Sequence, residues 1–127
     1  MFQKEVAQRI AEGPGSRTYG ILSVLLQTYY DIDYLFTVDE DAFDPPPRVK
    51  SGVIRLRRND LIDPGCSFSH LKRVVKGAFN QRRKTLRNAL ISAGFPEEVI
   101  PEEFLKKRAE QLSPTDFHRL SVALIPR

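Results

Sequence analysis

The residues best suited to chemistry lie in the run QRRKTLRN, residues 81–88. This run combines four basic residues with three polar side chains that can form hydrogen bonds. Arginine and lysine attract phosphates, whereas amide and hydroxyl groups can bind ribose hydroxyls and exposed base edges. The run therefore suits binding to RNA, although a solvated helix face can have a similar composition.

A second candidate is Phe43, which lies beside three consecutive prolines, Pro45, Pro46 and Pro47. Proline fixes φ at about −65° and favours an extended backbone, so this loop loses little entropy when it holds one shape. An aromatic ring on a rigid loop can stack on a base. From residue type alone a place in a core is favoured for Phe43, because aromatic side chains dominate cores.

Other reactive residue types do not form recognisable sites. His70 and His118 have no nucleophile or metal-binding partner at a suitable spacing. The glycines near residue 15 follow a helix pattern, whereas a phosphate-binding glycine loop follows a strand. The acidic groups at residues 39–41 and 97–103 lack a coordination pattern, so we expect no metal. The single cysteine cannot form an internal disulfide.

Positive charge is concentrated in the middle of the chain. Residues 48–94 carry 12 basic and 2 acidic residues, whereas residues 1–47 carry 3 and 8 and residues 95–127 carry 5 and 6. Such a concentration attracts a phosphate backbone through counterion release, which makes a nucleic acid the leading partner. No apolar run is long enough for a membrane span and no secretory signal opens the sequence, so we expect a cytoplasmic protein.

The elements that position these residues begin with a mixed α/β part. Apolar spacing predicts a helix at residues 4–11 and a second helix that begins near Thr18. Residues 31–38 and 51–57 have the composition and partial alternation of strands. They predict an antiparallel pair joined by the proline loop.

A linker at residues 59–67, which contains an Asp-Pro-Gly turn signal, separates this part from an all-helical remainder. We therefore place one domain at residues 1–58 and a second at residues 59–127.

The helical remainder begins near Phe68. An apolar stripe runs along residues 71–90, and Lys72, Lys76, Arg83 and Arg87 would lie beside it if the helix were continuous. A continuous helix would also put Arg82 on the apolar stripe. We therefore predict a turn at residues 81–84 and a second helix that ends at Gly94.

The last helix has the clearest start signal. Ser113 is predicted to cap it, Pro114 occupies the first helical position, and Asp116 occupies the acidic position of a capping box. Apolar residues then recur at helical spacing, so this helix should close the core of the second domain.

Five segments occur in the order found in KsgA-type ribosomal RNA small-subunit adenine N6,N6-dimethyltransferases: QKEVAQRI, PGSRTYGILSVLLQ, AFDPPPRVKSGVIRL, AFNQRRKTLRNAL and RAEQLSPTDF. The chain resembles the later part of this family over nearly its whole length, most weakly at residues 59–67 and 92–105. The resemblance implies the C-terminal part of a Rossmann-like methyltransferase sheet, with an antiparallel strand pair, followed by a small all-α domain. The fold should be mostly helical.

The resemblance also implies a function. The complete enzyme would use S-adenosylmethionine to methylate two adjacent adenines near the 3′ end of small-subunit ribosomal RNA. The family's glycine-rich cofactor loop, acidic ribose ligand and Asn-x-Pro-Tyr/Phe motif are missing from this sequence. We therefore expect no catalytic residue here and neither cofactor binding nor activity by this chain alone. The chain would be a truncated gene product, an incomplete reading frame or an expressed fragment.

By the same resemblance, Phe43, Pro45, Pro46 and Pro47 would form one wall of the pocket for the target adenine, with Phe43 stacking on the base. The resemblance and the charge pattern together predict a set of RNA-binding residues: Arg48, Lys50, Lys72, Lys76, Arg82, Arg83, Lys84, Arg87 and Asn88.

Three functions remain open from the sequence: the RNA-binding portion of a dimethyltransferase acting on the pre-30S particle, a non-enzymatic RNA-binding or ribosome-assembly module, and an interaction domain whose helix is basic by coincidence. We also expect apolar surface left by the missing part of the sheet to favour self-association.

Overall fold

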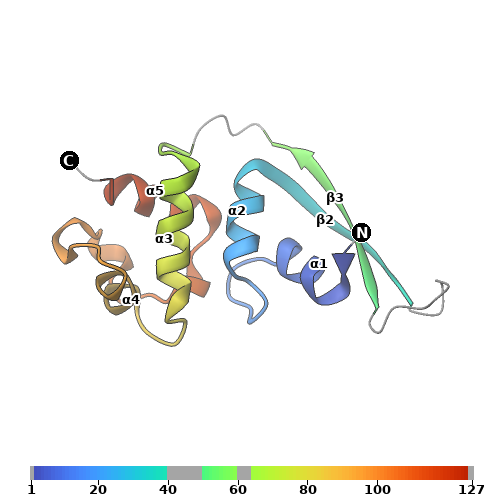
Figure 1. Cartoon of the computed structure of the whole chain (residues 1–127), viewed down its shortest axis with the longest axis horizontal. Coiled ribbons are helices and arrows are strands. Elements are labelled where there is room, and N and C mark those ends of the chain that lie inside the picture. The colour runs from blue at the N-terminus through green and yellow to red at the C-terminus, as the bar shows by residue number, and fades with distance from the viewer. Residues whose placement is uncertain (1, 40–49, 60–63, 126–127) are drawn as a thin grey trace.

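A computed structural model describes residues 2–39, 50–59 and 64–125. The first part contains β1 (Phe2–Gln3), α1 (Lys4–Ala11), α2 (Ile21–Tyr29), β2 (Tyr30–Val38) and β3 (Ser51–Arg58). The second contains α3 (Phe68–Asn80), α4 (Leu86–Ser92), α5 (Pro114–Ala123) and short 3-10 helices at Glu97–Val99, Glu102–Phe104 and Ala109–Gln111. The sheet lies at one end of an elongated molecule and the helical part at the other, with α2 between them (Figure 1). This arrangement confirms the predicted fold class.

The sheet has the order β1-β3-β2, and both pairings are antiparallel. The predicted pair of long strands is confirmed, whereas β1 was not predicted because two residues carry no periodic pattern. Helix α1 packs closely on β3, and Gly52 makes this possible. A Cβ at Gly52 would lie 2.7 Å from the Cβ of Ala7 and 3.0 Å from the Tyr34 hydroxyl, so a larger residue would force the helix away from the sheet.

Helix α2 begins at Ile21, so the predicted start near Thr18 is wrong. The reason is tertiary: Tyr19 is fully buried in the segment that precedes the helix, and its hydroxyl donates to the Leu112 carbonyl at 2.7 Å. Gly20 is extended and occupies the N-cap position. A periodic pattern cannot distinguish a buried residue in such a segment from the first turn of a helix.

The predicted turn at residues 81–84 is confirmed, with α3 ending at Asn80 and α4 beginning at Leu86. The break places Arg83 in the turn and Arg87 on α4. As the predicted turn implies, the four basic residues do not share one helical face, and of them Lys72 and Lys76 lie on the same helix. Gly94 has a φ of 95°, in the left-handed region that favours glycine after a helix.

The predicted start of α5 is confirmed in detail. The Ser113 hydroxyl accepts a hydrogen bond from the Asp116 amide at 3.1 Å, and the Asp116 carboxylate accepts one from the Ser113 amide at 3.2 Å. Pro114 occupies the first helical position, where a backbone N–H would have no acceptor within the helix, so the N–H that proline lacks is not missed. The start of this helix could therefore be predicted from local sequence alone.

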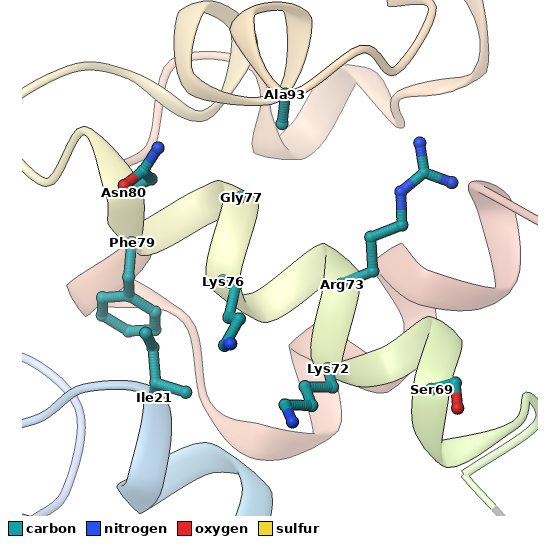
Figure 2. Close-up of a pocket in the computed structure, with 9 residues that line it drawn as sticks. All are labelled: Ile21, Ser69, Lys72, Arg73, Lys76, Gly77, Phe79, Asn80 and Ala93. Atoms are coloured by element: carbon teal, nitrogen blue, oxygen red, sulfur yellow. The ribbon is translucent and has the colours of Figure 1, made fainter.

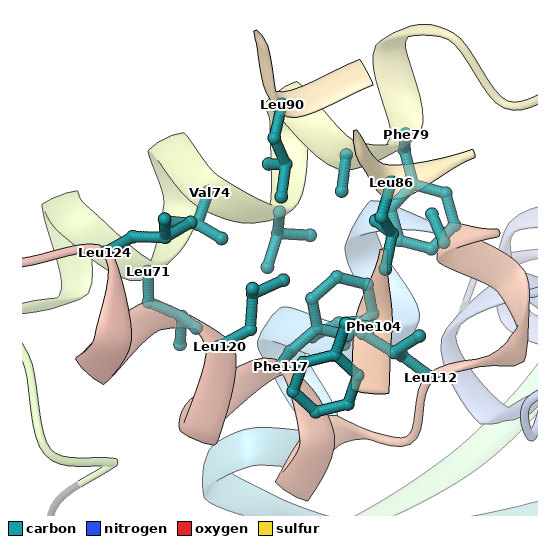
Figure 3. Close-up of a cluster of buried hydrophobic side chains, with 14 of the residues drawn as sticks. Leu71, Val74, Phe79, Leu86, Leu90, Phe104, Leu112, Phe117, Leu120 and Leu124 are labelled. Carbon is teal, nitrogen blue, oxygen red and sulfur yellow. The ribbon is translucent and has the colours of Figure 1, made fainter. Parts of the chain in front are cut away.

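The main core lies between α3, α5 and the segments around them (Figure 3). It also includes Tyr19, Val24 and Leu25, which precede the predicted linker. Helix α2 thus shares a core with the all-helical part, so the two parts are packed together. The division at residues 58 and 59 stays a prediction. Within the ranges that the structure describes, no helix is long and apolar enough to cross a membrane.

Candidate nucleic-acid interface

The outer face of α3 is polar and basic because its apolar stripe faces the core. Exposed residues recur along this face at helical spacing: Ser69, Lys72, Arg73, Lys76 and Asn80. Lys72 and Lys76 extend on the side of the helix that faces α2, whereas Arg73 extends on the side that faces Ala93 (Figure 2). The sequence predicted Lys72 and Lys76 as RNA-binding residues, and the fold places them together.

A hollow of about 770 Å³ runs along this face. Its lining includes Lys72, Arg73 and Lys76 over apolar groups that include Ile21 and Phe79. The charged groups thus surround an apolar floor, an arrangement that suits a ligand with an anionic backbone and flat apolar faces.

A second hollow of about 370 Å³ adjoins the first, since Ile21 and Phe79 line both. It is formed where the segment before α2 meets the turn after α3, and Arg9, Arg17 and Arg82 line it. We call the two hollows together the basic groove. Six cationic side chains line it, and no aspartate or glutamate is among its described lining residues.

The cations of the basic groove differ in how far they are already engaged. Arg17, Lys72 and Lys76 form no ion pair with any residue in the described part of the chain. The groove also contains the start of α2, which carries roughly half a positive charge from its aligned peptide dipoles. These three side chains therefore keep a positive charge in the groove that no carboxylate of the described residues pairs with.

The other three cations have internal partners. Arg9 pairs with Glu5 at 2.9 Å on the exposed side of α1. The Arg73 guanidinium lies 4.7 Å from the centre of the Phe95 ring, a cation–π contact. Arg82 is held by two backbone carbonyls and a carboxylate. These residues add charge to the groove, but their orientations are set by the protein.

The four predicted RNA-binding residues after Arg82 lie outside the lining of the groove: Arg83, Lys84, Arg87 and Asn88. Arg83 and Lys84 are exposed in the turn, and no carboxylate in the described ranges pairs with them. The Arg87 guanidinium donates to the Glu97 carboxylate at 2.6 Å, and this bond holds the pKa of Glu97 below its usual range. Binding by these four residues stays a prediction.

The predicted adenine-pocket residues Phe43, Pro45, Pro46 and Pro47 lie outside the described residues, as does Arg48. The ends of this segment are described. Lys50 pairs with Asp39 at 3.5 Å, and its carbonyl accepts a hydrogen bond from the Lys4 amide at 2.8 Å. The two residues that flank the segment therefore lie side by side at the end of the strand pair.

Sequence reasoning missed Arg9, Arg17 and Arg73 as residues of the interface. Arg9 and Arg17 lie in the acidic first third of the chain, where the charge count gave no signal. The segment PGSRTYGILSVLLQ, which contains Arg17, indicated only the family resemblance. Arg73 adjoins Lys72 and could have been found from its helical spacing to Lys76 and Asn80.

The histidines have structural roles. His118 on α5 bonds through Nε2 to the Thr28 hydroxyl at 2.8 Å, and because that hydroxyl donates to the Val24 carbonyl, Nε2 must carry the hydrogen. His70 Nε2 lies 2.8 Å from the Ser121 carbonyl. No group of three potential metal ligands occurs among the residues that the structure describes.

Comparison with known proteins decides the family. The family model for ribosomal RNA adenine dimethylase matches residues 1–125. The chain belongs to the ribosomal RNA adenine dimethylase family. Ribosomal RNA small subunit methyltransferase A from Porphyromonas gingivalis is 58% identical over 98% of this chain, and the match covers 48% of that protein. The proteins of the same name from Parabacteroides distasonis and Cytophaga hutchinsonii are both 55% identical, with 46% and 47% of their lengths covered.

Solved structures of related enzymes have the same fold. A dimethyladenosine transferase from Plasmodium falciparum superposes with a TM-score of 0.79 at 21% identity, over 94% of this chain and 53% of that protein. The 23S rRNA methyltransferase ErmE gives a TM-score of 0.62 at 21% identity, over 98% of this chain and 52% of that protein. This member of the dimethylase family thus spans about half the length of the relatives it matches.

Proposed function

We propose that this chain is the portion of an S-adenosylmethionine-dependent ribosomal RNA adenine N6,N6-dimethyltransferase that binds small-subunit ribosomal RNA and positions it near the target adenines. The observation that carries the proposal is the basic groove, which six cationic side chains line without a carboxylate. Family membership supplies the class of reaction. The groove supports the identity of the substrate, because a polyanion is the ligand that neutralises it.

Lys72, Lys76 and Arg17 are the residues that would contact phosphates. None of them forms an ion pair with a residue that the structure describes, so binding would break no such pair. Arg17 belongs to the second hollow and the lysines to the first, so a backbone that follows the groove would meet cations at both ends. Contacts to several phosphates fix the orientation of a nucleic acid without reading its sequence. Positioning of this kind lowers the barrier to methyl transfer by reducing the entropy that the reaction must lose.

The segment that would hold the target adenine begins beside the sheet. The Asp39–Lys50 ion pair and the pairing of Val38 with Ser51 bring the two ends of this segment together. Phe43 and Pro45, Pro46 and Pro47 would then line one side of the pocket, with Arg48 and Lys50 beside it. In this proposal the phosphate contacts hold the RNA while Phe43 stacks on the extruded base.

S-adenosylmethionine does not fit the basic groove, because its sulfonium is a cation and the groove is lined by cations. We derive no step of the reaction through this cofactor. The cofactor would bind the part of a longer protein that carries the glycine-rich loop and the Asn-x-Pro-Tyr/Phe motif. The chain alone would be inactive, and its partner in a longer protein would be the pre-30S particle in the cytoplasm.

A second proposal concerns the sheet, where four large apolar side chains are between 40% and 55% exposed: Phe2, Leu35, Phe36 and Leu56. Only the end of β3 that contains Ser51 and Gly52 pairs with β1. Apolar surface beside an unpaired strand edge favours association between copies. We expect the 127-residue chain to self-associate, and light scattering that gives a monomer at high concentration would contradict this.

The alternative function is a non-enzymatic RNA-binding or ribosome-assembly module that has the groove without a catalytic part. The DNA upstream of the first codon distinguishes the two. An in-frame continuation with a glycine-rich loop and an Asn-x-Pro-Tyr/Phe motif supports the methyltransferase. A promoter and a translation start at Met1 support the module.

The binding experiment uses the 127-residue chain and a transcript of the 3′-terminal segment of small-subunit ribosomal RNA, with fluorescence anisotropy measured at several salt concentrations. A structured RNA of unrelated sequence and a DNA duplex of equal length are the controls. We expect tighter binding to the ribosomal transcript and an affinity that falls steeply with salt. Equal affinity for all three would remove the ribosomal substrate from the proposal, and no binding would remove RNA altogether.

A further inference from the structure

We propose that Arg82 is a positioning residue, which holds the wall of the basic groove in place for RNA instead of contacting a phosphate itself. This inference rests on the proposed RNA-binding function of the groove. It concerns Arg82, which is one of the four basic residues in the run at residues 81–88. The structure assigns this member a different role from that of its exposed neighbours Arg83 and Lys84.

Two of the three nitrogens of the Arg82 guanidinium already have acceptors within the protein. Its Nη2 donates to the carbonyls of Tyr19 and Ser16, the second at 3.3 Å, and its Nε lies 3.5 Å from a Glu110 carboxylate oxygen. The guanidinium carbon also lies 5.5 Å from the centre of the Phe79 ring. Arg82 therefore joins three segments: the chain before α2, the turn after α3 and the 3-10 helix Ala109–Gln111.

The segment that Arg82 holds contains residues of the groove. Arg17 and Thr18 lie between the two carbonyls that accept from Arg82, and both line the second hollow. Two further bonds fasten the same segment to the helical part. The Gly15 amide donates to the Glu110 carbonyl at 2.6 Å, and the Tyr19 hydroxyl donates to the Leu112 carbonyl at 2.7 Å. Arg82 supplies the attachment nearest to Arg17.

An arginine is needed for this arrangement because its planar guanidinium presents five donors at fixed angles. A lysine keeps the positive charge and binds phosphates well, but its ammonium on a flexible stem cannot reach two carbonyls and a carboxylate in the same geometry. Arg82→Lys therefore separates the two roles. A direct phosphate contact would largely survive this substitution, whereas the positioning of the segment would not.

The first test measures the affinity of Arg82→Lys for the 3′-terminal ribosomal RNA transcript, with Arg108→Lys as a matched control. Arg108 is exposed, and its guanidinium pairs with no carboxylate in the described ranges. We expect Arg82→Lys to bind about fivefold more weakly, which corresponds to the loss of roughly one ordinary hydrogen bond, and the control to match the wild type. Wild-type affinity in Arg82→Lys would overturn the proposal.

The second test removes the carboxylate that orients Arg82. Glu110→Gln removes a negative charge beside the groove, so RNA affinity rises if Arg82 is a direct contact or only stabilises the fold. If Arg82 positions the segment, affinity falls, by about twofold, because the guanidinium loses an anchor. Glu98→Gln, which removes an exposed carboxylate elsewhere, is the control for charge alone. Tighter binding by Glu110→Gln than by Glu98→Gln contradicts the positioning role.

A third measurement does not involve RNA. Hydrogen exchange at the amides of Gly15, Tyr19 and Gly20 reports on the held segment, and we expect about fivefold faster exchange in Arg82→Lys while the core of α3 is unchanged. Unchanged exchange at these amides overturns the proposal even if RNA affinity falls. If the wild type binds no RNA, the proposed function fails, and hydrogen exchange still decides whether Arg82 holds the segment.

Discussion

The two ends of α2 carry hollows of nearly equal size and opposite charge. The second hollow of the basic groove, at the N-terminal end, has a volume of about 370 Å³ and three arginines in its lining. The hollow at the C-terminal end has a volume of about 360 Å³, with Asp31 and Asp33 in its lining and no basic residue among the lining residues that the structure describes. Since their volumes match, the charge of the residues that line them distinguishes the two hollows.

The comparison indicates that the balance of neighbouring positive and negative charges is a better guide to the proposed RNA-binding surface than the number of basic residues on one helix or strand. Arg55 and Arg57 on β3 belong to the basic middle of the sequence, yet both pair with Asp33. The Arg55 hydrogen bond holds the pKa of Asp33 below its usual range. These arginines are therefore engaged by the sheet, whereas Lys72 and Lys76 remain available on α3. The dipole of α2 reinforces the same difference, because its positive end points to the basic groove.

The largest effect is expected where the available cations are removed. Lys72→Ala combined with Lys76→Ala should weaken binding to the 3′-terminal ribosomal RNA transcript about tenfold and reduce the slope of log K against log salt by about 1.5, since each lost phosphate contact contributes roughly 0.7 to 0.9. Anisotropy titrations over a range of salt measure both. Lys106→Ala with Lys107→Ala removes the same charge outside the groove, and an equal loss in that control would refute the comparison.

A smaller effect is expected in the turn and on α4. Arg83→Ala combined with Arg87→Ala should weaken binding about threefold and reduce the salt slope by about 0.7, because Arg87 already binds Glu97 and only Arg83 is fully available. The same titrations measure this change. A slope that does not change would limit the interface to the groove, whereas a loss as large as that of the lysine pair would extend the interface across α4.

The acidic hollow provides the converse test. Asp31→Lys replaces a negative charge by a positive one at the C-terminal end of α2, and we expect RNA affinity to change by less than about twofold because the proposed RNA site lies at the other end and salt screens distant charges. The measurement is anisotropy at physiological ionic strength. A severalfold gain would place the RNA across both ends of α2 and end the distinction between the hollows.

The weakest effect concerns the contact between α2 and α5. Burial lowers the pKa of His118 below that of an unfolded chain, so the unfolded state binds the proton more readily. Stability should therefore fall as pH drops below about 6.5 and level off below the folded pKa, with a decrease of about 2 to 4 °C in Tm. Circular dichroism melts between pH 7.5 and 5 measure this. His118→Gln should lose part of the decrease, and an identical pH dependence in that variant assigns the effect to other groups.

Much of the fold followed from local signals. The capping residues of α5, the break after α3 and the long strand pair are each determined by residues close in sequence, so sequence patterns predicted them. The start of α2 was missed because the burial of Tyr19 depends on Leu112, which is 93 residues away. A contact between residues so far apart in the sequence does not produce a hydrophobic periodicity from which it could be predicted.

The site was predicted in part for the same reason. Lys72 and Lys76 follow from helical spacing on one element. Arg9 and Arg17 enter the groove only because α2 shares a core with the helical part, which places the segment before α2 against the turn after α3. The different roles of Arg82 and Arg83 depend on which backbone carbonyls surround each guanidinium. Adjacent positions in a basic run do not carry that information.

The central claim is that RNA binds in the basic groove at the N-terminal end of α2. The most direct measurement is an NMR titration of the ¹⁵N-labelled 127-residue chain with the 3′-terminal ribosomal RNA transcript. We predict that the largest amide shift changes occur at residues 16–22 and 69–80, while residues 30–33 and 114–115 at the acidic hollow barely change. Shift changes centred on the acidic hollow, or spread evenly over the chain, would contradict the account.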